Sequence, residues 1–136
     1  MLFYYNSTMN EYSYIEIYKD ENILAVQKNH GVYVIPDRQN TVTPLIDILR
    51  QDYGEVYVTH RLDAGTGGLM IFARNKSAHR HISMQFEKSA IIKYYIAVTD
   101  NKIFPQSLML PLAKSNHGKY TVNFKSGKNA VTSFYN

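Results

Sequence analysis

HRLDAGTGGLMIFARN, residues 60–75, places one carboxylate, Asp63, between two segments with strand patterns. Residues 55–59 (EVYVT) alternate polar and apolar side chains, and residues 69–73 (LMIFA) form a continuous apolar run. Alternation predicts a half-buried strand, and a short apolar run fits a buried one. Asp63 is therefore expected in a loop that joins two strands.

The composition of this loop allows two interpretations of Asp63. Glycine stands at positions 65, 67 and 68, and Arg61 and Thr66 flank the carboxylate. Glycine lets backbone approach a ligand closely or adopt a positive φ, so the loop can present a carboxylate at a surface. An aspartate in such a loop also commonly closes a turn by bonding its own backbone. Both the structural and the catalytic interpretation stay open at this point.

The composition of the 136-residue chain is that of a folded globular protein, with 45% hydrophobic and 19% charged residues. No window reaches the roughly 18 uninterrupted apolar residues of a membrane span. The first ten residues lack the basic and apolar regions of a secretion signal. Because cysteine is also absent, we expect a cytoplasmic protein.

Two kinds of catalytic site are not supported by the sequence. His60 and Asp63 resemble a metal pair, but no second dense cluster of His, Cys or Asp supplies further ligands, so we expect no metal. No serine lies in a G-x-S-x-G motif and cysteine is absent, so a hydrolase nucleophile is not indicated.

Charge is distributed unevenly along the chain, whose net charge is +4. Residues 1–55 contain four Lys/Arg against eight Asp/Glu, whereas residues 56–136 contain 11 against three. This asymmetry indicates a polyanionic partner for the second part. A basic surface that is only solvated is the alternative, and charge does not distinguish RNA, DNA and acidic proteins.

Periodicity and turn residues predict the other elements. We predict strands at 12–18 and 23–26, a helix from a Thr43 cap through Pro44 to about Asp52, a helix from an Asn75 cap to about Glu87, a strand at 91–99, a connection at 100–109, and a hairpin of strands 120–124 and 130–135 around a turn at 125–129. The sequence thus predicts one α+β unit with a mixed, mostly antiparallel sheet and flanking helices.

The loop and three further segments resemble the RluA-type pseudouridine synthases. Residues 60–75 resemble the family signature HRLD-x-x-T-S-G-L. The other segments follow in family order: ILAVQKNHG (23–31) resembles a strand and K-P-x-G turn, QF (85–86) with KYYIA (93–97) resembles QF and K-x-Y-x-A, and GKNAVTSFY (127–135) resembles G-K-x-A-x-T-x-Y. The resemblance covers roughly residues 22–135.

The chain departs from the family pattern in two residues and in extent. Asn29 replaces the usual Pro and Gly67 replaces the usual Ser, and neither change removes a catalytic group. Family catalytic domains continue into a GRTHQIR-like segment whose Arg pairs with the catalytic Asp, and residues 1–136 contain no such segment. We expect the chain to be the N-terminal half to two-thirds of a catalytic domain, truncated at its C-terminus, without a separate N-terminal RNA-binding domain.

The resemblance implies an enzyme that isomerises uridine to pseudouridine in ribosomal or transfer RNA, with the target base flipped out and no cofactor. It assigns Asp63 as the catalytic carboxylate and Arg61 as the residue that fills the space vacated by the target nucleotide. Tyr95 would contact the flipped uracil, although an ordinary strand aromatic is the alternative.

The remaining site residues are assigned supporting roles. Lys93, expected on the same strand face as Tyr95, would support the uracil site or bind phosphate. His60 is expected to shape the loop at the substrate site, and Thr66 to bond loop backbone. Three basic residues near the loop are the candidate ligands of the RNA backbone: Arg74, Lys76 and Arg80.

Two other functions stay open. A catalytically inactive RNA-binding domain of the same fold would bind RNA almost equally well after Asp63→Asn. A basic protein-interaction module would show no salt-sensitive affinity for RNA.

Overall fold

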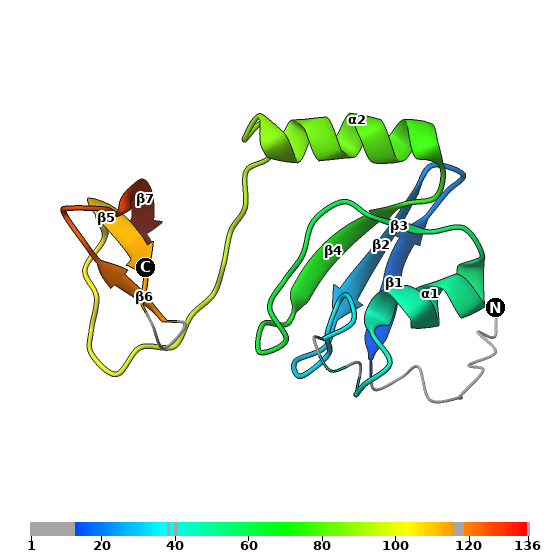
Figure 1. Ribbon diagram of the computed structural model, residues 1–136, viewed down its shortest axis with the longest axis horizontal. Coiled ribbons are helices and arrows are strands. Elements are labelled where there is room, and N and C mark those ends of the chain that lie inside the picture. Colours follow the sequence, from blue (N-terminus) through cyan, green and yellow to red (C-terminus); the bar gives the residue numbers. More distant parts are fainter. Residues whose placement is uncertain (1–12, 38, 40, 116–118, 136) are drawn as a thin grey trace. The chain divides into compact units, whose positions relative to one another are not determined.

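The computed structural model describes residues 13–37, 39, 41–115 and 119–135 and forms two compact units, Met1–Lys93 and Tyr94–Asn136. The first unit contains β1 (Tyr14–Lys19), β2 (Ile23–Lys28), α1 (Leu45–Tyr53), β3 (Tyr57–Val58), β4 (Gly68–Ala73) and α2 (Lys76–Glu87) (Figure 1). The second contains β5 (Gln106–Lys114), β6 (Tyr120–Val122) and β7 (Lys128–Phe134).

The first unit is built on a four-stranded sheet in the order β1-β2-β4-β3, with every neighbouring pair antiparallel. β2 and β4 are paired along their whole length, from Ile23 opposite Ala73 to Lys28 opposite Gly68. The expectation of α+β structure with antiparallel pairing is therefore confirmed. The described strands form two separate sheets.

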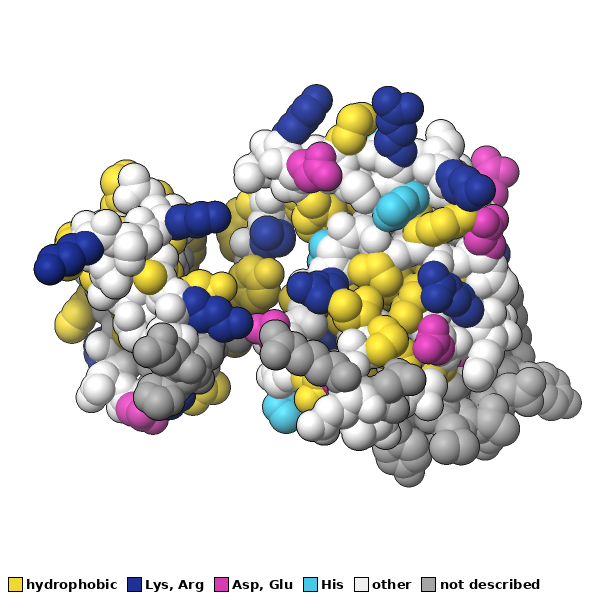
Figure 2. Space-filling view, viewed as in Figure 1, with side chains coloured by type: hydrophobic (Ala, Val, Ile, Leu, Met, Phe, Trp, Pro, Cys, Tyr) yellow, Lys and Arg dark blue, Asp and Glu magenta, His cyan; other side chains and the backbone are white. Residues whose placement is uncertain are grey.

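One face of this sheet forms the core with α1. Leu24 and Val26 of β2 and Phe72 of β4 are fully buried, as are Leu45 and Leu49 of α1. The strand residues alternate in period two, and the helix residues are four apart, so each element turns one apolar face inward. Hydrophobic side chains also reach the surface, and Figure 2 shows them among Lys and Arg side chains.

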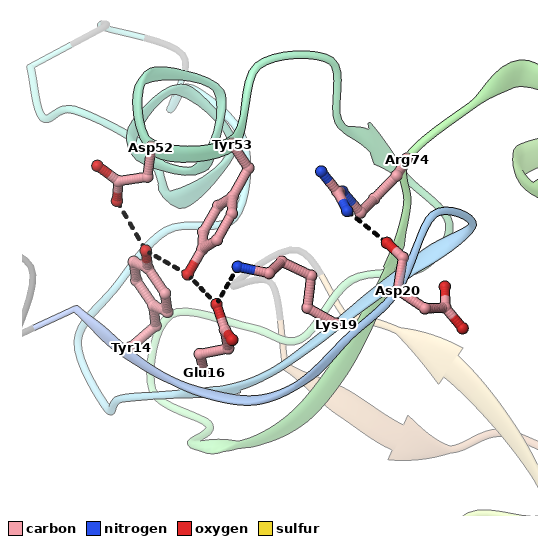
Figure 3. A network of polar contacts seen from close by, with 7 residues as sticks. All are labelled: Tyr14, Glu16, Lys19, Asp20, Asp52, Tyr53 and Arg74. Carbon is pink, nitrogen blue, oxygen red and sulfur yellow. Dashed lines mark hydrogen bonds and ion pairs between the residues drawn. The ribbon is translucent and has the colours of Figure 1, made fainter. Parts of the chain in front are cut away.

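A chain of hydroxyls and carboxylates joins β1 to α1 (Figure 3). The Tyr14 hydroxyl donates to Asp52 at 2.7 Å and lies 3.3 Å from the Tyr53 hydroxyl, which donates to Glu16 at 2.6 Å. Lys19 pairs with Glu16 at 3.5 Å. Burial and the hydrogen bond to Glu16 raise the pKa of Tyr53 to about 12. The edge strand is thus fixed to the helix by polar contacts.

The two helices match the sequence expectations apart from one cap. α1 begins after Pro44, which is itself the N-cap, so the Thr43 cap is wrong by one position. Its C-cap is Gly54, whose φ of 78° favours glycine and whose N–H donates to the Arg50 carbonyl. α2 begins after Asn75, whose side chain accepts the Ala78 N–H, as predicted.

The second unit is a three-stranded sheet in the order β6-β5-β7. The predicted hairpin of 120–124 and 130–135 is wrong, because β6 and β7 both pair with β5 and lie on opposite sides of it. The connection predicted at 100–109 overlaps the start of β5. Pro111 within β5 has no N–H to donate, but its carbonyl accepts the Asn123 N–H at 2.8 Å.

The predicted strand at 91–99 is also wrong. None of the described strands pairs with these residues, and Tyr94, Ile96 and Val98 are at least 84% exposed. Branched and aromatic residues give a segment strand propensity, but a strand forms only where a neighbour accepts and donates ladder hydrogen bonds.

Candidate functional site

The loop that carries Asp63 lies between β3 and β4, as predicted. β3 ends at Val58. Beyond it, the side chains of Thr59 and His60 bind backbone groups of β4 that a longer β3 would have paired with. The Thr59 hydroxyl donates to the Ile71 carbonyl, and the Ile71 N–H donates to His60 Nε2 at 3.1 Å. Side chains therefore fasten the start of the loop to the sheet.

His60 also contacts α2. Its ring stacks on Phe86 with centroids 4.4 Å apart and planes 24° apart, and Lys93 Nζ lies 6.0 Å from the centroid of the same Phe86 ring. Burial, and secondly the charge of Lys93, lower the pKa of His60. The imidazole that accepts the Ile71 N–H is therefore kept neutral. Lys93 reaches this neighbourhood from an irregular segment instead of the predicted strand.

The tip of the loop is a turn with an exposed carboxylate. The Asp63 carbonyl accepts the Thr66 N–H at 2.9 Å, so this turn bond joins two backbone groups and does not use the aspartate side chain. The backbone of Thr66 makes this contact. Asp63 and Arg61 are both exposed. The backbone of Asp63 thus serves the turn, and its carboxylate stays accessible.

Lys28 is a site residue to which the sequence analysis assigned no role. It is fully buried at the end of β2, and its ammonium group donates to the carbonyls of Val32 at 2.8 Å, Asn29 at 3.1 Å and Ala64 at 3.4 Å. Burial lowers the pKa of Lys28, and the charge of Asp63 opposes that shift. Its place in the inward alternation Leu24, Val26, Lys28 was the signal that could have identified it.

The loop after β2 and the Asp63 loop lie against each other. The Gly31 N–H donates to the Ala64 carbonyl at 2.7 Å. A Cβ at Gly67 would lie 3.3 Å from the Lys28 carbonyl and 3.5 Å from the His30 nitrogen, so this close approach favours glycine. The glycine that replaces the family serine therefore fits the local backbone spacing.

The three candidate phosphate ligands have different surroundings. Arg74 donates to the Asp20 carbonyl in the β1–β2 turn (Figure 3), and its Nε is buried without a hydrogen-bond partner among the described residues. Lys76 and Arg80 are exposed on α2. Arg74 therefore has a structural contact, and the RNA contacts of all three residues stay predictions.

Tyr95 belongs to the second unit and is 65% exposed. It lies in the irregular segment 91–99, so the shared strand face that was expected for Lys93 and Tyr95 is wrong. Its predicted contact with uracil stays a prediction.

Positive charge is concentrated in the second unit. The first unit contains ten Lys/Arg and ten Asp/Glu, whereas the second contains five Lys and one Asp. Figure 2 shows basic side chains on the visible faces of both units. Residues 94–136 thus carry a net charge equal to that of the whole chain, whereas the basic residues 56–93 of the first unit are balanced by the acidic residues before them.

Among the residues that the structure describes, no three His, Asp or Glu side chains are grouped so that they could hold a metal ion. None of the described helices is long and apolar enough to cross a membrane.

Comparison with known proteins gives a consistent family. The family model described as RNA pseudouridylate synthase matches residues 22–136. The dual-specificity RNA pseudouridine synthase RluA of Vibrio vulnificus is 33% identical over 123 residues, which are 87% of this chain and 49% of that protein. The protein of the same description from Haemophilus influenzae is 29% identical over 135 residues, 96% of this chain and 61% of that protein.

A solved structure has a similar fold. Human RNA pseudouridylate synthase domain containing 1 matches with a TM-score of 0.65 at 18% identity, over 90% of this chain and 51% of that one. The chain spans about half the length of the relatives that it matches. The family match covers most of the chain and includes the Asp63 loop, and the protein therefore belongs to the RNA pseudouridylate synthase family.

Proposed function

We propose that this protein takes part in isomerising uridine to pseudouridine in ribosomal or transfer RNA in the cytoplasm, with Asp63 as the catalytic carboxylate. The observation that carries the proposal is an exposed carboxylate on a loop that is held at its start by His60 and next to Asp63 by the Ala64 carbonyl, inside the region that matches the family. A reactive group gains from such fixation, because a carboxylate held in one geometry needs less ordering when substrate arrives.

The reaction breaks the bond between ribose C1′ and uracil N1, turns the base, and joins C1′ to uracil C5; C5 loses its proton and N1 takes up a proton from solvent, so the product is an isomer of the substrate. The Asp63 carboxylate acts at the sugar, either as a nucleophile at C1′ or as a base in a glycal route. Isomerisation consumes no second substrate. The base returns to the same ribose, so we expect no cofactor.

RNA must present the target uridine outside its stack, because a base inside a stem does not reach a protein carboxylate. Unstacking costs on the order of a few kcal/mol. Arg61, exposed beside Asp63, is suited to occupy the space that the nucleotide leaves. Tyr95 would contact the flipped ring, and Lys93 would support the uracil site or bind phosphate.

Contacts with RNA phosphates are assigned to exposed basic groups. Lys76 and Arg80 lie on α2 in the same unit as Asp63, and the second unit adds its excess of lysines. Arg74 is the weakest of the three candidates, because its guanidinium already binds the β1–β2 turn. Phosphate contacts give affinity that falls with salt and does not select sequence.

The test is tritium release from RNA labelled at uracil C5, with RNA from cells that lack such modifications. Asp63→Asn should lower the rate by at least about a thousandfold, as expected for removal of a covalent catalyst, and leave RNA affinity within about twofold. Asp100→Asn is the matched control, because Asp100 is an exposed aspartate of the second unit.

Release that is equal in wild type and Asp63→Asn would overturn the assignment of Asp63. Salt-sensitive RNA binding without release from either protein would instead indicate an RNA-binding domain that is inactive alone. Absence of both release and RNA binding would support a protein-interaction module.

A further inference from the structure

Two side chains, Thr59 and His60, hold the junction between β3 and the Asp63 loop. β3 pairs with β4 only through Tyr57 and Val58, so the next residue of β4, Ile71, has no partner strand on that side. The Thr59 hydroxyl binds its carbonyl and His60 Nε2 binds its N–H at 3.1 Å. These two contacts extend the ladder by side chains at the point where the loop begins.

The contact with the N–H requires one protonation state of His60. An imidazolium has no acceptor nitrogen, so Nε2 accepts the Ile71 N–H only when the ring is neutral and its proton is on Nδ1. The His60 ring is held in place by stacking on Phe86, with the two ring centroids 4.4 Å apart. Protonation of Nε2 would place two N–H donors against each other and break the contact.

The groups around His60 favour the neutral ring. Strand β4 carries no ionisable side chain. On the side of α2, Lys93 lies over the Phe86 ring that stacks on His60, and its positive charge acts against protonation of His60. His79 of α2 stacks on Tyr57 and lies 3.0 Å from the Val58 carbonyl. The loop itself contributes the exposed Arg61 and Asp63.

We propose that His60 is a positioning residue for Asp63. Its neutral imidazole holds the start of the Asp63 loop on β4. This rests on the proposed function of Asp63. Protonation of His60 breaks this one contact and loosens the start of the loop, although Thr59 still bonds Ile71 and Lys28 still bonds Ala64, and the turn between Asp63 and Thr66 becomes less fixed. The rate of isomerisation therefore falls on the acidic side because of a group that does not touch the substrate.

Two substitutions separate the acceptor from the ring. His60→Phe keeps an aromatic ring against Phe86 but has no acceptor, whereas His60→Gln supplies an acceptor oxygen that does not titrate in this range. At neutral pH we expect kcat to fall about tenfold in His60→Phe, with KM within about twofold, and to be partly recovered in His60→Gln. The acidic fall of the pH profile should be absent from His60→Gln. His81→Gln is the control, because His81 is exposed on α2.

A second readout does not use activity. The protection of the Thr66 amide, taken relative to the exchange rate of an unstructured chain at the same pH, should fall about tenfold in His60→Phe, less in His60→Gln, and in wild type only as the pH is lowered through the titration of His60. If the chain releases no tritium, the proposed function fails while this readout still tests the role of His60. Should His60→Phe not fold, the comparison of wild type with His60→Gln across pH decides the matter. Equal amide exchange in both at every pH, or an unchanged acidic limb in His60→Gln, would overturn the proposal.

Discussion

The two sheets of this protein are stabilised in different ways. The first has a face on which Leu24, Val26 and Phe72 are fully buried under α1. In the second sheet, no described residue of β5, β6 or β7 is buried. Both sheets satisfy their backbone groups by antiparallel pairing, but only the first gains free energy by removing large side chains from water. In this protein, strands can therefore pair into a sheet without forming a buried hydrophobic core.

The largest expected difference is between two phenylalanines. Phe72 is fully buried in the first unit and Phe124 is 82% exposed in the second. Phe72→Ala should lower the free energy of unfolding by about 3–5 kcal/mol, because it loses apolar burial and leaves a cavity. Phe124→Ala should change it by less than about 0.5 kcal/mol. Urea unfolding measures both, and equal losses would show that the second sheet has a core after all.

The next effect concerns the buried charge at the edge of the first core. Lys28→Met keeps the length of the side chain but leaves the carbonyls of Asn29, Val32 and Ala64 without their shared donor. We expect a loss of about 2–3 kcal/mol in the same measurement, because buried acceptors lose a charged donor, although the Ala64 carbonyl keeps the Gly31 N–H. Lys125→Met, at an exposed lysine of the second unit, should be nearly neutral. A Lys28→Met protein as stable as wild type would mean that water replaces the ammonium group.

The second sheet should be sensitive to backbone shape instead. A Cβ at Gly127 would lie 2.4 Å from the Asn123 carbonyl oxygen and 2.6 Å from the Pro111 carbonyl carbon. Gly127→Ala must therefore shift the turn between β6 and β7, at an expected loss of about 1–2 kcal/mol. Faster exchange of the Asn123 amide, which bonds Pro111, would report this loss within the second unit.

Gly65→Ala is the matched control for the glycine experiment. The nearest atom to its Cβ would be His30 Nε2 at 3.9 Å, which is ordinary contact. Faster Asn123 exchange in this variant would mean that the turn is not the cause.

The smallest effect is expected in the polar chain between β1 and α1. Tyr53→Phe removes the bond to Glu16 and should lower the free energy of unfolding by about 1 kcal/mol at pH 8. The pKa of Tyr53 is raised to about 12 from an ordinary value near 10, so its contribution is complete below pH 10 and is lost as pH rises toward 12. The urea midpoints of wild type and Tyr53→Phe should differ at pH 8, and the difference should shrink as the pH rises above 10. A constant gap would contradict this linkage.

Sequence patterns predicted local features of the fold better than long-range ones. The Asn75 cap, the end of α1 at Gly54 and the loop position of Asp63 depend on neighbouring residues, and all three are observed. The strand at 91–99 and the hairpin partner of 130–135 depend on which segment lies alongside, and both were wrong. Alternation identifies a residue's face but not its neighbour in the sheet.

The candidate site shows the same division. The motif identified Asp63, His60 and Arg61, because they are adjacent in the chain. Lys28 was missed as a site residue, since its three carbonyl partners come from two loops that meet only in the fold. Arg74 was assigned to RNA from its charge, whereas its contact with the Asp20 carbonyl depends on the pairing of distant segments.

The side chain of Asn75 uses both ends of its amide. Its oxygen accepts the Ala78 N–H at 2.8 Å, and its nitrogen donates to the Asn22 side chain at 2.9 Å. Aspartate, serine and threonine are interchangeable with asparagine at many helix starts. Here an aspartate, whether from mutation or from deamidation during chemical ageing, would still cap α2 but would oppose the Asn22 oxygen with a carboxylate. A replacement that is conservative for the helix therefore breaks the hydrogen bond that links the helix start to Asn22 in the β1–β2 turn.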